Sequence, residues 1–213
     1  MISAANPARD LNFAQGVDVF ERVLALGLFF LFCSRMADKI WLDEGYIYAL
    51  VIAVELFVLY FMLFRKLACN VSTLPRDWVV AVLGTCLPML VVPAVHEPIA
   101  PAFFCGLLIV LGFTIQFYGK LTLNRNFGIV AANRGVKTKG PYILVRHPIY
   151  LGYILSHTGF LLYAPHWWNT IVYTSGFAFQ VLRILAEERL LSADVLYREY
   201  AAKVPYRLVP GLF

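Results

Sequence analysis

The sequence predicts an all-α protein: a polytopic transmembrane helical bundle of five to six membrane helices with a cytoplasmic C-terminal catalytic region. Hydrophobic residues make up 61% of the 213 residues and charged residues only 15%, whereas a soluble domain carries roughly 25% charge. The apolar residues fall in long runs, as helices in lipid require. Low charge and frequent aromatic residues exclude a disordered chain. Since no linker divides the sequence, we expect a single integral-membrane domain over 1–213.

Six apolar runs approach the length of about 20 residues that a helix needs to cross a bilayer. The fifth run is short and the sixth ends in charged residues, so this last pair forms either two full spans or a re-entrant, shallow hairpin. The predicted spans are 17–34, 45–64, 78–95, 99–119, 149–164 and 167–186.

The basic residues predict the orientation of these spans. If the N-terminus lies inside, every Lys and Arg except Arg35 and Lys39 falls in an inner segment or at the inner end of a span. This distribution satisfies the positive-inside rule, so we expect both termini in the cytoplasm. It also explains the net charge of +5 without nucleic acid as a partner. The first run lacks a clear cleavage site, so we expect no removed signal peptide.

Polar residues divide the chain into two functional parts. The N-terminal transmembrane helices, 1–119, carry few polar groups, whereas 120–213 is rich in them. The loop in this second part contains an Asn-Arg-Asn-Phe-Gly run at 124–128 and the turn formers Gly135 and Gly140-Pro141. A polar tail with several Tyr and Arg residues, 197–211, is suited to the headgroup layer and to covering a site as a lid. We therefore expect the chemistry in 120–213.

Arg146 and His147 directly precede the fifth predicted helix, in which Pro148 suits the first turn. Free backbone N–H groups and the positive end of the helix dipole favour an anion there, such as a carboxylate or phosphate. The alternative is that both cations only anchor the helix beside lipid headgroups.

Arg183, Glu187 and Glu188 end the sixth run. Arg183 and Glu187 are four residues apart, so they share one helix face and can orient each other. Ionisable groups at the inner end of an apolar helix are candidates for function, while the alternative is a solvated helix end.

Two polar residues inside the apolar runs remain without an assigned role. Glu55 is costly in lipid when ionised, so it faces other helices, pairs, or is protonated. His157 is either a packing residue or functional. The four cysteines have no metal-like spacing, so we expect neither a disulfide nor a metal site; they are Cys33, Cys69, Cys86 and Cys105.

The C-terminal part resembles a known family. It contains G-P-Y at 140–142, R-H-P-x-Y-x-G at 146–152, R-x-x-x-E-E at 183–188 and Y-x-x-Y at 197–200. In this order the motifs resemble the isoprenylcysteine carboxyl methyltransferase family. This family is one of the integral-membrane S-adenosylmethionine-dependent methyltransferases, which also include phospholipid N-methyltransferases. The resemblance covers about Phe127 to Gly211 and omits the first four spans.

The resemblance implies that S-adenosylmethionine binds between the last two helices, the loop and the tail, and leaves as S-adenosylhomocysteine. It implies that Arg183 holds an acceptor carboxylate, that Glu187 is catalytic, and that no metal takes part. The cofactor-binding residues that it implies are Tyr142, Arg146, His147, Tyr150, Leu151, Gly152, Glu187 and Glu188.

The acceptor is therefore expected to be lipophilic, most simply an isoprenylcysteine-like carboxylate. The runner-up is the amine of a phospholipid headgroup, for which Glu187 would remove a proton. A sterol-reductase-like membrane enzyme with a nicotinamide cofactor and a non-enzymatic transporter or scaffold are further alternatives. The motifs of soluble dinucleotide, nucleotriphosphate, zinc-protease and serine-hydrolase sites are missing from the sequence. The natural acceptor and the oligomeric state do not follow from the sequence.

Overall fold

The described part of the chain in the computed structural model, residues 7–64, 74–93, 96–123 and 135–213, is helical and contains no strand. Short 3₁₀ helices join or follow some of the α-helices. The α-helices are α1 (Pro7–Met36), α2 (Tyr46–Leu63), α3 (Pro75–Cys86), α4 (Ala102–Leu123), α5 (Pro148–Tyr163), α6 (Trp167–Leu191) and α7 (Val195–Lys203). The 3₁₀ helices are η1 (Ala37–Trp41), η2 (Leu87–Leu90) and η4 (Gly140–Ile143). The predicted all-α fold is confirmed for these residues.

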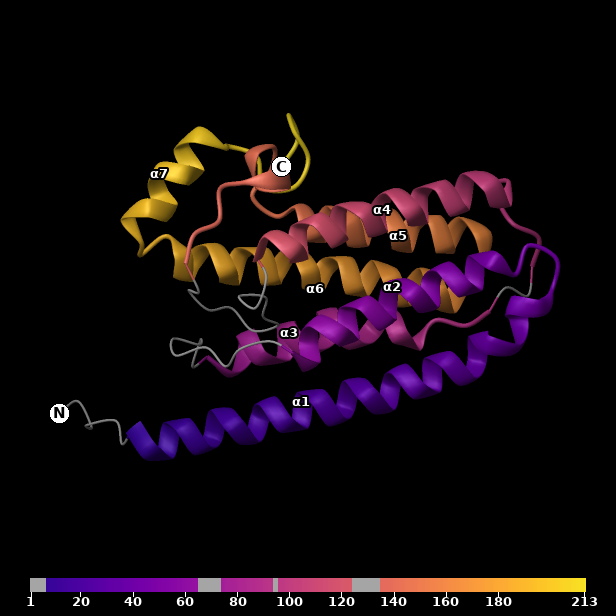
Figure 1. The fold of residues 1–213 in the computed structure, drawn as a ribbon, viewed down its shortest axis with the longest axis horizontal. Helices are drawn as coiled ribbons and strands as arrows, with labels where there is room; N and C mark the ends of the chain where they lie inside the picture. Colours follow the sequence, from indigo (N-terminus) through magenta and orange to yellow (C-terminus); the bar gives the residue numbers. More distant parts are fainter. Residues whose placement is uncertain (1–6, 65–73, 94–95, 124–134) are drawn as a thin grey trace.

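The long helices lie side by side along the long axis of the molecule (Figure 1). The start of α5, the end of α6 and the short helix α7 lie at one end of this axis, and α1 begins at the same end. Two helices, α2 and α4, are long and apolar enough to cross a membrane. The larger number of spans and the cytoplasmic position of the termini remain predictions.

The third predicted span, 78–95, is wrong as a single helix. Helix α3 starts three residues earlier, with Pro75 in its first turn, and ends at Cys86. The chain continues as the 3₁₀ helix η2, with Pro88 in its first turn, and is extended at Val91. Pro88 has no N–H for an α-helical hydrogen bond, and its ring clashes with the carbonyl four residues earlier. With 12 residues, α3 is too short to cross a bilayer alone.

The other predicted boundaries need smaller corrections. Helix α1 extends well beyond 17–34 at its N-terminal end. Helix α6 continues past 186 to Leu191, which places the charged residues 187–189 within the helix. Apolarity predicts where lipid can surround a helix, whereas backbone hydrogen bonding continues until a cap or a proline ends it. Here α6 gives way to α7, whose first turn is capped by the Asp194 carboxylate accepting from the Leu196 N–H.

Helices α4 and α5 pack closely through glycines that recur every seven residues. These are Gly112 and Gly119 on α4 and Gly152 and Gly159 on α5. A Cβ atom at Gly112 would lie 2.5 Å from the carbonyl oxygen of Gly152, and one at Gly152 would lie 2.6 Å from the carbonyl oxygen of Gly112. Small residues allow such close backbone contact between helices. This contact holds α5, and with it the residues that precede α5, against α4.

Apolar side chains cover much of the outer surface. The exposed fraction reaches 72% for Phe30 on α1 and 78% for Phe103 on α4, and α6 exposes Ile171, Leu182 and Leu185. Exposed apolar surface of this extent marks an interaction with lipid or with another protein. Together with the lengths of α2 and α4, it supports a membrane location.

Candidate functional site

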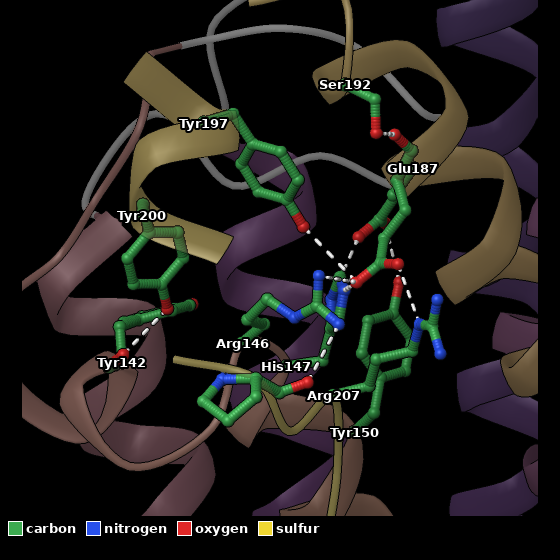
Figure 2. Close-up of polar contacts among 11 residues, drawn as sticks. Tyr142, Arg146, His147, Tyr150, Glu187, Ser192, Tyr197, Tyr200 and Arg207 are labelled. Atoms are coloured by element: carbon green, nitrogen blue, oxygen red, sulfur yellow. Dashed lines mark hydrogen bonds and ion pairs between the residues drawn. The ribbon is translucent and has the colours of Figure 1, made fainter. Parts of the chain in front are cut away.

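The carboxylate of Glu188, near the end of α6, is the centre of a polar cluster. Arg146, His147 and Tyr197, which are labelled in Figure 2, contribute to this cluster. Its Oε1 lies 3.2 Å from Arg146 Nη1 and 3.2 Å from His147 Nε2. The Tyr197 hydroxyl donates to the same oxygen at 3.3 Å, and Arg207 Nε donates to Oε2 at 2.7 Å. The side chains of Glu188 and His147 are 10% and 6% exposed, so these charges interact with little screening from water.

The segment after α7 completes this cluster from the other side. The backbone N–H of Arg146 donates to the Tyr206 carbonyl at 3.0 Å, and that of His147 donates to the Arg207 carbonyl at 2.8 Å. Arg146 Nη2 also donates to the Pro205 carbonyl at 3.1 Å. The N–H groups of Arg146 and His147 are therefore not free to bind an anion. The anion beside the two cations is the protein's own Glu188.

Glu187 connects the start of α5 to Arg183. It accepts a hydrogen bond from the Tyr150 hydroxyl at 2.6 Å. Its carboxylate oxygens also lie 3.4 Å from Arg183 Nε and 3.7 Å from His147 Nδ1. The Glu187 side chain is 21% exposed, compared with 10% for Glu188. Of the two acids, Glu187 is thus the more accessible to a ligand.

Arg183 is buried and has contacts on two sides. Besides its ion pair with Glu187, Nη1 donates to the Thr85 hydroxyl on α3 at 3.3 Å. The guanidinium lies over the Tyr150 ring, 5.4 Å from its centroid. A cation close to an aromatic face is attracted by the ring quadrupole. These contacts give the guanidinium a defined orientation.

Tyr142 in η4 lies next to this cluster and contacts the tail. Its carbonyl accepts a hydrogen bond from the Tyr200 hydroxyl at 2.6 Å, and its own hydroxyl lies 3.5 Å from the Gly119 carbonyl. Burial raises the pKa of the Tyr142 hydroxyl, and the negative charge of Glu187 raises it further. Tyr142 is therefore a neutral hydrogen-bonding group that joins the loop, α4 and α7.

Opposing effects act on the pKa of Glu188, which lies beyond the predicted sixth span. Burial raises this pKa, but hydrogen bonds from His147 and Arg207 and the charges of His147 and Arg146 lower it more strongly, to about 2. Glu188 is therefore ionised at every pH at which the protein is expected to work. It stabilises the positive charges around it.

The structure brings most of the predicted site residues together. Arg146, His147, Tyr150, Arg183, Glu187 and Glu188 form one connected cluster. Gly152 lies outside it, against Gln116 and Gly112 of α4. Leu151 lies in an apolar group with Val209. The run at 124–128 and Cys69 lie outside the described residues.

Two contacts of this site were not predicted from the sequence. Arg207 was seen only as part of a basic, tyrosine-rich tail, and Thr85 only as part of an apolar run. Nothing in their local sequence indicates that they contact Glu188 and Arg183.

Most of the cluster lies within a segment that matches a known family. Residues 101–197 match the phospholipid methyltransferase family. This match indicates a membrane methyltransferase. It covers α4, α5, α6 and the start of α7 but less than half of the chain. It includes Arg146, His147, Arg183, Glu187 and Glu188 and ends before Arg207. No curated protein matches the chain.

Proposed function

We propose that the protein transfers a methyl group from S-adenosylmethionine to a lipophilic acceptor at the membrane. The observation that carries the proposal is the connected cluster of Arg146, His147, Tyr150, Arg183 and Glu187 at one end of an apolar helical bundle. The match of residues 101–197 to the phospholipid methyltransferase family supports the same reaction class.

The residues of the cluster suit this cofactor, which carries a carboxylate, an ammonium group, ribose hydroxyls and a sulfonium. Three arginines, Arg146, Arg183 and Arg207, surround the carboxylates of Glu187 and Glu188. The three arginines exceed the two glutamates by one positive charge, which favours the cofactor's carboxylate. The buried Nε of Arg146 has no hydrogen-bond partner among the described residues. A buried donor without a partner is costly, so a ligand acceptor at this position would be stabilising.

The roles of the side chains follow from these contacts. Arg146 and His147 would hold the carboxylate, while Glu187 would bind the ammonium or ribose hydroxyls of the cofactor. Tyr142, Leu151 and Gly152 would shape the surrounding walls. When bound, the cofactor supplies an electrophilic methyl group. The chain's contribution to the reaction is alignment of the two reactants, which can lower a barrier by about 7–11 kcal/mol.

The leading acceptor is a carboxylate on an apolar group, such as an isoprenylcysteine-like thioether acid. Arg183 supports this choice because a guanidinium can grip a carboxylate through two parallel hydrogen bonds. Its contacts with Glu187, Thr85 and the Tyr150 ring would orient it for this purpose. An ionised carboxylate needs no general base.

The second candidate acceptor is the amine of a phospholipid headgroup. The family match favours it, because its family is defined by phospholipid methylation. An ammonium group must lose a proton before it can act as a nucleophile, and Glu187 is a base within the cluster.

Two measurements test these proposals. Calorimetric titration of the detergent-solubilised protein with S-adenosylhomocysteine and, separately, with a nicotinamide cofactor distinguishes a methyltransferase from a reductase. We expect heat only with S-adenosylhomocysteine, and its absence contradicts the proposal. Incubation with labelled S-adenosylmethionine and either farnesylated cysteine or phosphatidylethanolamine then identifies the acceptor. A methyl ester releases methanol in base, whereas a methylated amine does not.

A further inference from the structure

A small cavity lies deeper in the bundle, between α2, α3, α5 and α6. Its volume of about 10 Å³ is room for about one water molecule. Its polar lining comes from Glu55, Thr85, Tyr153, His157, Gln180 and Arg183. Arg183 therefore lies both on this cavity and in the cluster around Glu187.

Glu55 and His157, the two residues without a role in the sequence analysis, lie next to each other. Glu55 Oε1 lies 3.6 Å from His157 Nε2, and the two residues are 5% and 4% exposed. This separation is longer than a hydrogen bond, and both ring nitrogens of His157 are buried without a hydrogen-bond partner among the described residues. Gln180 Oε1 has none there either.

The surroundings of His157 allow it to accept a proton. The imidazole stacks on Tyr153 and Tyr173, with ring centroids 5.9 and 4.7 Å apart, and aromatic faces stabilise a cation. Phe177 stacks on it as well, at 6.0 Å.

Two cations near the cavity would repel a positive charge on His157. Lys120 of α4 lies 4.9 Å from the centroid of the Tyr153 ring, and Arg183 of α6 lines the cavity. The residues that α3 contributes to the cavity wall do not titrate.

We propose that His157, positioned by Glu55, accepts the proton that an ammonium acceptor must lose before methylation. This inference rests on the proposed function with its second candidate acceptor, a lipid with a protonated amine, and makes His157 the base in place of Glu187. The N–H bond of the ammonium breaks and its electron pair stays on nitrogen. The proton passes through the single water that fits the cavity and bonds to a ring nitrogen of His157. The nitrogen lone pair then forms the N–C bond while the C–S bond of the donor breaks toward sulfur. The imidazolium finally returns the proton to solvent.

The first test uses the wild-type protein and does not depend on turnover. ¹⁵N NMR of histidine-labelled protein with S-adenosylhomocysteine follows the four histidines, and His157→Asn identifies the signal of His157. Vesicles of phosphatidylethanolamine, which has N–H bonds, should shift this signal, because the ammonium donates a hydrogen bond toward His157 through the water in the cavity. Vesicles of phosphatidylcholine, which has none, should leave it unchanged. Equal signals in both vesicles would overturn the inference.

The second test separates a proton-accepting role from a packing role. At neutral pH, Glu55→Gln and His157→Asn should lower turnover on phosphatidylethanolamine by about 10²-fold or more. Affinity for S-adenosylhomocysteine should not change, which also shows that the variants fold. Turnover should recover as the pH rises toward the pKa of the lipid amine, and Glu55→Asp should retain part of it. The control is His96→Asn, which changes an exposed histidine that stacks on His166.

The outcomes distinguish this inference from the proposed function. If wild-type protein does not bind S-adenosylhomocysteine, the proposed function fails and the inference fails with it. If it binds S-adenosylhomocysteine but methylates only farnesylated cysteine, the inference alone is overturned. Full turnover of Glu55→Gln on the lipid amine at neutral pH would also overturn the inference alone.

Discussion

Arg207 Nε donates a hydrogen bond of 2.7 Å to Glu188 Oε2, which connects the segment after α7 to the end of α6. The same segment accepts hydrogen bonds from the backbone N–H groups of Arg146 and His147. Glu188 is thus the point at which the start of α5, the end of α6 and the tail meet. The negative charge of Glu188 therefore helps to hold these three segments together.

The first prediction concerns the pH dependence of this contact. The pKa of Glu188 lies at about 2, below the ordinary value of 4.5, so the folded state favours the ionised form. The stabilisation is fully present above pH 4.5 and is lost as the pH falls from 4.5 toward 2. Thermal unfolding in detergent should show wild type more stable than Glu188→Gln at neutral pH, by about 2 kcal/mol. This difference should shrink across that acidic window.

The control for this prediction is Glu199→Gln, which changes an exposed carboxylate of α7. Its stability should follow that of wild type at every pH. A constant difference between wild type and Glu188→Gln down to pH 2.5 would show that the contact does not depend on the charge of Glu188.

The second prediction concerns the orientation of Arg183. Arg183→Lys should leave affinity for S-adenosylhomocysteine unchanged and lower turnover by about 100-fold, because a small misplacement of a positioning group can cost that much. A lysine has one point charge and cannot contact Glu187, Thr85 and an acceptor in the same fixed geometry. Isothermal titration and steady-state kinetics measure the two quantities. Arg189→Lys, on the same helix, is the control, and normal turnover of Arg183→Lys removes the role proposed for Arg183.

The third prediction concerns cofactor affinity. His147→Ala should weaken binding of S-adenosylhomocysteine about tenfold, or 1.4 kcal/mol, because His147 contacts both Glu187 and Glu188. Calorimetric titration measures the change. His96→Ala is a matched control, since His96 is exposed and stacks on His166, which precedes α6. Unaltered affinity of His147→Ala would exclude His147 from the cofactor site.

The fourth prediction concerns the contact between α4 and α5. Gly112→Ala should destabilise the protein by about 1–3 kcal/mol, because its Cβ would overlap the Gly152 carbonyl. A Cβ atom at Gly27 on α1 would have no neighbouring atom within 4 Å. Gly27→Ala should therefore be neutral or slightly stabilising, since alanine favours helices. Thermal unfolding in one detergent compares the two. Equal melting temperatures would mean that α4 and α5 pack less closely than described.

The predicted helices match the structure best where the apolar run and the backbone hydrogen bonding end at nearly the same residues. The runs at 45–64 and 99–119 correspond closely to α2 and α4 because apolarity there coincides with uninterrupted backbone hydrogen bonding. The run at 78–95 misled because its apolarity continues through Pro88, which ends the α-helix. The ranges predicted for α1 and α6 were too short because polar residues can continue a helix beyond the lipid.

Part of the site was determined by the sequence alone, because local spacing places the residues concerned. Arg183 and Glu187 meet through one turn of helix, and Arg146 and His147 precede α5 because Pro148 starts that helix. Only the tertiary structure decided which distant groups join them. Arg207 reaches Glu188, Thr85 reaches Arg183, and His157 reaches Glu55 through the packing of separate helices. Such contacts depend on how helices approach and rotate against one another, which here includes the glycine contact between α4 and α5, and no local pattern in the chain specifies them.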